Sequence, residues 1–95
     1  MPEMRFTIRW PDGTAESCYS PSLVIRDYFA PGTSYPLADF LEKSREALTI
    51  ASQRVEARYG FPCSRALGQL ARIEAGARAF SAFPNPRVTV EAFDA

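Results

Sequence analysis

Two cysteines, Cys18 and Cys63, are the side chains of this chain best suited to nucleophilic or redox chemistry. A reactive cysteine needs a thiolate, which a neighbouring His or a helix N-terminus commonly stabilises. The chain contains no His, but Cys63 directly precedes a predicted helix start and Cys18 precedes a second one. Both are therefore candidate catalytic residues. The alternative is that both are small buried apolar side chains, the commonest role of free cysteine.

Metal and cofactor chemistry has little support in the composition. A structural zinc site needs about four Cys or His ligands, and an iron–sulfur cluster needs a similar set. Two isolated cysteines without His do not supply either set. The chain also has no Gly-rich phosphate loop or nucleotide fingerprint. We therefore expect neither a metal nor a cofactor.

Two groups of residues are candidates for binding. The segment Cys18–Ser22 and the only Trp could line a small-ligand pocket, which gives Trp10, Tyr19, Ser20 and Ser22 as candidate contacts. Small or apolar residues on two predicted helices could instead form a docking face for a partner. These residues are Ile50, Ala57, Gly68, Ala71, Ala75 and Ala79. The competing interpretation is that the Gly and Ala residues pack within their own chain.

Length and charge limit the class of protein. Ninety-five residues are expected to form one domain, residues 1–95, and 11 bases balance 11 acids. A neutral chain gives no electrostatic reason to bind nucleic acid or a membrane surface, and weak charge repulsion permits self-association. Residues 1–5 lack the apolar region of a secretory signal, so we expect a cytoplasmic protein with free thiols.

Residue periodicity predicts a hairpin at the start of the chain. Arg5–Trp10 alternates apolar and polar residues, as a half-buried strand does. Pro11–Gly13 has the residue types of a tight turn, and Thr14–Tyr19 is expected to return antiparallel.

Helices are predicted in the middle of the chain. Ser20 could cap a short helix over residues 23–29, although an extended segment is almost as plausible there. Residues 30–34 are expected to form a loop. A long helix is predicted over Pro36–Tyr59 with Gly60 at its C-terminus, and a second over Ser64–Phe80. The helical spacing of apolar residues predicts that Tyr59 on the first helix and Leu67 on the second face the core.

The last element completes the fold class. Arg87–Phe93 alternates again and is predicted to be a strand. We therefore predict an α+β fold in the order ββ(α)ααβ. A small antiparallel sheet, made by the hairpin and the C-terminal strand, packs against two main antiparallel helices.

Four segments together resemble a family of short bacterial proteins described as nitrogen-starvation response proteins. Members are typically encoded beside a nitrilase, a radical S-adenosylmethionine protein, an acetyltransferase-like protein, a flavoprotein and a synthase-like enzyme. The resemblance implies a part in nitrogen metabolism or small-molecule biosynthesis, and it carries over no catalytic residue. The segments are Arg9–Gly13, Cys18–Ser22, Tyr35–Phe40 and Ser44–Leu48.

These observations favour an accessory or interaction protein without catalysis of its own. Its expected partner is one of the co-encoded enzymes of the nitrilase-type cluster. A small thiol-dependent enzyme or redox switch that uses Cys18 or Cys63 is the first alternative. A small-ligand-binding sensor is the second.

Overall fold

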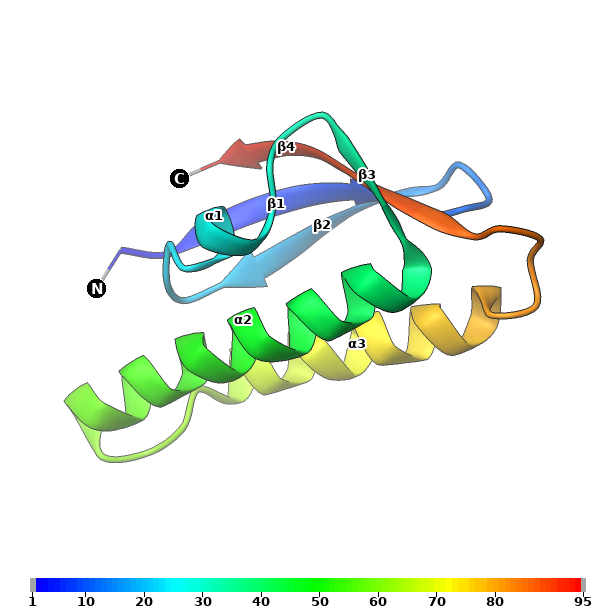
Figure 1. The fold of residues 1–95 in the computed structure, drawn as a ribbon. Coiled ribbons are helices and arrows are strands. Elements are labelled where there is room, and N and C mark those ends of the chain that lie inside the picture. The colour runs from blue at the N-terminus through cyan, green and yellow to red at the C-terminus, as the bar shows by residue number, and fades with distance from the viewer. Residues whose placement is uncertain (1, 95) are drawn as a thin grey trace.

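One four-stranded antiparallel sheet and three helices make up the fold, of which a computed structural model describes residues 2–94. The strands lie in the order β2-β1-β4-β3. Figure 1 shows the two long helices side by side on one face of this sheet, which confirms the predicted α+β class. The elements are β1 Met4–Arg9, β2 Ala15–Ser20, α1 Ile25–Tyr28, β3 Thr33–Pro36, α2 Leu37–Tyr59, α3 Ser64–Phe80 and β4 Arg87–Asp94.

The predicted hairpin is present and its register sets the inner face of the sheet. The turn closes with a hydrogen bond from the Trp10 N–H to the Thr14 carbonyl at 2.8 Å, and Gly13 adopts the positive φ that the turn requires. Phe6 lies opposite Cys18, and both side chains are fully buried. The alternation along β1 therefore places its apolar residues toward the helices.

A fourth strand, β3, begins within the predicted loop over residues 30–34 and ends at Pro36, which was predicted to begin the long helix. Thr33–Pro36 pairs with Arg87–Val90 of β4, and the preceding Gly32 N–H donates to the Val90 carbonyl at 2.7 Å. The segment is short, ends in Pro and has no apolar alternation that predicts a strand. Its pairing depends on β4, which is more than 50 positions further along the chain.

The predicted cap at Ser20 was wrong. Ser20 is the last residue of β2, and its hydroxyl donates to the Ser22 carbonyl at 2.7 Å. The Ser20 hydroxyl accepts the Ser22 N–H and the Ser22 hydroxyl accepts the Val24 N–H, each at 3.3 Å. Neither side chain caps α1, which begins only at Ile25. The polar segment thus forms a compact turn before the helix rather than its first turn.

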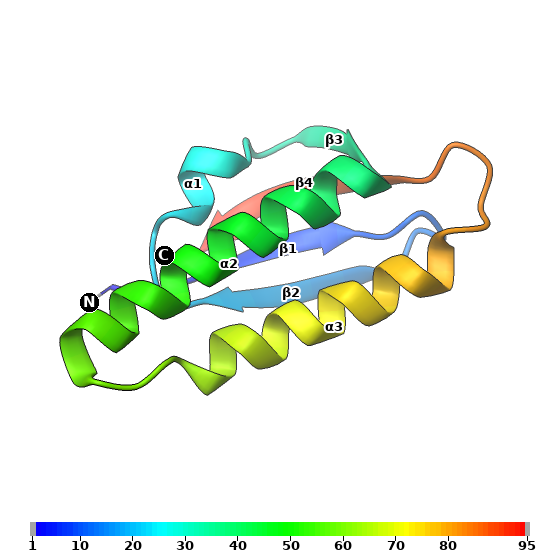
Figure 2. The ribbon, with the colours of Figure 1, turned by 60° about the horizontal axis from the view of Figure 1, so that its bottom comes forward.

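Both long helices have the predicted bounds within one residue. Gly60 ends α2 in the left-handed conformation, with its N–H bonded to the Glu56 carbonyl. Figure 2 shows that the α2–α3 hairpin extends beyond the ends of the strands. Tyr59, which was predicted to face the core, is therefore 54% exposed because no sheet lies beneath it. Leu67, also predicted to be a core residue, is 45% exposed.

Trp10 packs between the sheet and the two long helices at the turn end of the hairpin. Its ring meets Phe40 of α2 edge-on at 6.0 Å and stacks on Phe80 of α3 at 5.5 Å, measured between ring centroids. The indole N–H donates to Oε1 of Glu16 at 3.0 Å, so the buried ring keeps a hydrogen-bond partner. Gly76 of α3 lies directly against the ring, and a Cβ there would be 2.5 Å from it.

The contact between Gly76 and Trp10 predicts that two Gly→Ala substitutions on α3 have opposite effects on stability. Gly76→Ala should destabilise the fold by about 1–3 kcal/mol, because the new methyl group overpacks against Trp10. Gly68→Ala should stabilise it by about 0.5–1 kcal/mol, because its Cβ would meet no atom within 4 Å and Ala favours the helix. Denaturant unfolding measures both changes. Equal effects of the two substitutions would contradict the packing argument.

Candidate functional site

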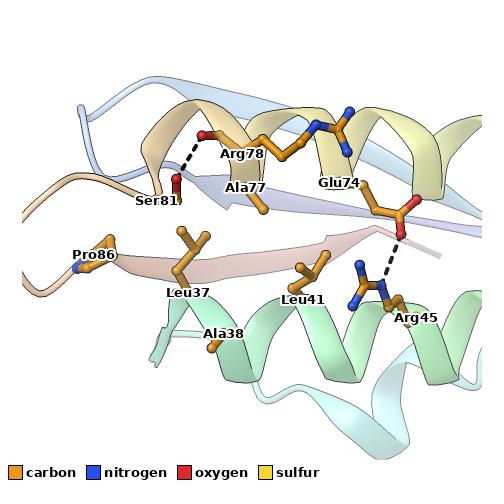
Figure 3. A pocket seen from close by; sticks show the side chains of 9 residues that line it. All are labelled: Leu37, Ala38, Leu41, Arg45, Glu74, Ala77, Arg78, Ser81 and Pro86. Carbon is orange, nitrogen blue, oxygen red and sulfur yellow. Dashed lines mark hydrogen bonds and ion pairs between the residues drawn. The ribbon is translucent and has the colours of Figure 1, made fainter.

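A groove of about 450 Å³ runs between α2 and α3 at the end where α2 begins (Figure 3). Its volume is in the range of small-molecule sites. Leu37 and Leu41 of α2 point into the space between the helices. The residues that line it are Leu37, Ala38, Leu41, Arg45, Glu74, Ala77, Arg78, Ser81 and Pro86.

Charged side chains lie at the rim of this groove over an apolar floor. Arg45 Nε and Glu74 Oε2 form an ion pair at 2.9 Å across the helices. Within residues 2–94, the Arg78 guanidinium forms neither an ion pair nor a side-chain hydrogen bond. The groove can therefore accept an apolar body and place a carboxylate group beside Arg78.

Cys18 is sequestered in the core. Its side chain is fully buried beneath the helices. Burial raises the pKa of the thiol to about 12, and the negative charge of Glu16 acts in the same direction. A thiolate nucleophile is therefore disfavoured at this position near neutral pH.

Cys63 lies in a different environment, at the N-cap of α3. It is half-buried, and its backbone N–H donates to the Ser52 hydroxyl at 3.2 Å. A small cavity of about 180 Å³ brings it near Tyr19 and Tyr59. Burial raises the pKa of Tyr19, and its hydrogen bond to the Glu3 carboxylate raises that pKa further.

The candidate ligand contacts of the hairpin do not converge on one pocket. Trp10 lies at the turn end of β1, whereas Ser20 pairs with Met4 at the opposite end. The Ser22 hydroxyl accepts from Arg54 Nη1 at 2.9 Å, and this turn is buried. Of these four residues, Tyr19 lines surface cavities.

The residues proposed for a partner interface lie mostly at the surface. Ala57, Gly68, Ala71, Ala75 and Ala79 are exposed, and Ile50 is half-buried. The sequence reasoning did not include the larger apolar residues near the α2–α3 connection. Tyr59, Phe61 and Leu67 are 54%, 64% and 45% exposed. Phe61, an aromatic residue in the turn after Gly60, was the feature of the sequence that could have indicated this exposed surface.

Across residues 2–94, no group of three or more Cys, Asp or Glu side chains is arranged to hold a metal ion. None of the helices in that range is long and apolar enough to cross a membrane.

The two cysteines should differ sharply in reactivity. In the native protein at about pH 8, a thiol reagent should modify Cys63, whereas Cys18 should stay protonated because its raised pKa delays thiolate formation until far higher pH. Mass spectrometry after labelling identifies the modified residue. Cys63→Ser should abolish native labelling, and unfolding should expose Cys18. Rapid native labelling of Cys18 would contradict its burial.

Comparison with known proteins assigns the chain to a family. No curated protein and no solved structure matches it. A family model described as nitrogen starvation-induced protein NitG matches residues 5–93, which is nearly the whole chain. The chain therefore belongs to the family of the nitrogen starvation-induced protein NitG.

Proposed function

We propose that this protein is an accessory protein of the nitrogen-starvation response that docks on one of the enzymes encoded beside it. The observation that carries this proposal is the exposure of three large apolar side chains at or near the α2–α3 connection. Tyr59, Phe61 and Leu67 are about half exposed or more, although the core beneath the sheet is well filled. Clustered exposed apolar side chains commonly mark protein interaction sites.

The neighbouring surface of α3 suits close approach by a partner. Gly68, Ala71, Ala75 and Ala79 form an exposed row of small residues along the helix that follows the projecting end. Small side chains let another backbone come near. The fully buried, protonated Cys18 weighs against the thiol-enzyme alternative, which would depend on Cys63.

A second candidate function, a small-ligand sensor, is favoured by the groove between α2 and α3. Its floor is apolar, and Arg78 supplies a cation at the rim. This arrangement fits a small molecule with an apolar body and a carboxylate group. The location differs from the Trp10 and Ser22 region that the sequence suggested.

The docking proposal predicts capture of one enzyme from nitrogen-starved native cells by the tagged protein. Mass spectrometry should recover that enzyme in stoichiometric amount. The double substitution Tyr59→Ser with Phe61→Ser should reduce recovery by about tenfold or more, since exposed aromatic anchors often dominate binding. Phe83→Ser is the matched control, because Phe83 is an exposed aromatic residue outside the α2–α3 connection. Recovery of the tagged protein alone, or equal recovery by both variants, would overturn the proposal.

The sensor candidate predicts that octanoate raises the unfolding temperature. Arg78→Gln should weaken this stabilisation, and Ala38→Trp should remove it by filling the groove at an exposed position. Arg58→Gln is the charge-matched control, since Arg58 does not line the groove. The sensor candidate fails if octanoate stabilises all of these variants equally.

A further inference from the structure

A separate cavity of about 290 Å³ lies between α3 and the edge strand β2. We call it the arginine cavity, because its lining, unlike that of the groove, contains three Arg side chains. Arg65 and Arg72 of α3 line it together with Arg5 of β1. Ser17 and Tyr19 of β2 and Gly68 and Gln69 of α3 complete the lining. The cavity therefore joins three guanidinium groups with a hydroxyl and an amide, and its lining contains no carboxylate.

Gln69 is the buried group that this arrangement leaves unsatisfied. Its side chain is 94% buried, since its relative exposure is 6%. Oε1 accepts the Tyr19 backbone N–H at 2.9 Å, which fixes the amide so that Nε2 is the free end. Nε2 has no hydrogen-bond partner in the described chain. A buried donor without an acceptor is costly, and the surrounding guanidinium groups are donors only.

The three guanidinium groups are held near the cavity without being fully paired. The Arg65 guanidinium lies 3.8 Å from the centre of the Tyr19 ring, and its nearest acid oxygen, on Glu3, is 3.9 Å away. Arg72 and Glu16 are 3.6 Å apart. Within residues 2–94, Arg5 forms no ion pair and only a 3.3 Å hydrogen bond to Ser17. Donor capacity therefore remains at all three positions.

Two of the acids near this region line a neighbouring cavity instead. Glu3 and Asp94 line that neighbour, and the two cavities share Arg5, Tyr19 and Arg65 as their common wall. The Tyr19 hydroxyl donates to Glu3 on that side. The lining that an anion in the arginine cavity would meet therefore contains no carboxylate, and Glu16 lies outside it beside Arg72.

We propose that the cavity formed by Arg5, Arg65, Arg72 and Gln69 binds the phosphoryl group of a small metabolite. A tetrahedral dianion offers several oxygen acceptors to guanidinium groups, which match phosphate geometry, and it supplies the acceptor that Gln69 lacks. The space in front of Gly68 is open, because a Cβ at this position would meet no atom within 4 Å. The cavity volume suits a phosphoryl group with a few further atoms.

The test is a titration with inorganic phosphate and glycerol phosphate at constant ionic strength, followed by NMR of the side-chain amides. Gln53, Gln69 and Asn85 carry these amides, so the other two serve as internal references. Both phosphates should shift the Gln69 amide signal saturably, whereas acetate at the same ionic strength should not. Arg5→Gln and Arg72→Gln should each weaken binding by about tenfold, and Arg26→Gln on α1 should leave it unchanged.

A further variant distinguishes binding inside the cavity from attraction of the anion to surface charge alone. Gly68→Met fills the cavity while keeping every Arg, and Met is a better helix former than Gly, so the fold is retained. It should abolish the Gln69 shift. Absence of a saturable Gln69 shift, or equal binding by Gly68→Met, would overturn the proposal. Tighter binding of a phosphoserine peptide than of glycerol phosphate would also overturn it, because the ligand would then be a protein.

Discussion

The close contact between Trp10 and Gly76 is the constraint on which the arrangement of the sheet and helices depends. The indole can lie between Phe40 and Phe80 only because α3 presents a residue without a Cβ at that point. A protein interior is packed densely enough that one extra methyl group shifts its neighbours. The position of α3 on the sheet therefore follows from a pair of residues that lie 66 positions apart.

Trp10 is also hydrogen-bonded to the edge strand of the sheet. Glu16 lies on the helix-facing side of β2, where it accepts the Trp10 indole N–H and lies near Arg72. Gln69, three residues before Arg72, accepts the backbone N–H of Tyr19 at the outer edge of β2. This side chain occupies part of an edge that would otherwise be open to another strand. Packing of α3 thus both protects the edge and assembles the arginine cavity.

Two of the candidate binding surfaces lie at opposite ends of the helical hairpin. The helical hairpin is longer than the strands, so Tyr59 and Phe61 have no sheet to cover them. At the opposite end, α2 and α3 leave the groove beside Leu37 and Arg78. One short chain thereby presents three chemically different surfaces: an aromatic end, an apolar groove and a cavity of guanidinium groups.

The elements with strong local periodicity could be predicted from the amino-acid sequence alone. The alternation over β1 and the helical spacing over α2 and α3 report burial on one face, and Gly60 marks a helix end through backbone geometry alone. Only the tertiary structure decided the fourth strand, the exposure of Tyr59 and Leu67, and the neighbours of Cys18. It also joined Arg5 of β1 with Arg65 and Arg72 of α3. These features depend on contacts between distant segments, and a pattern that repeats every two or four residues carries no information about which distant face a side chain meets.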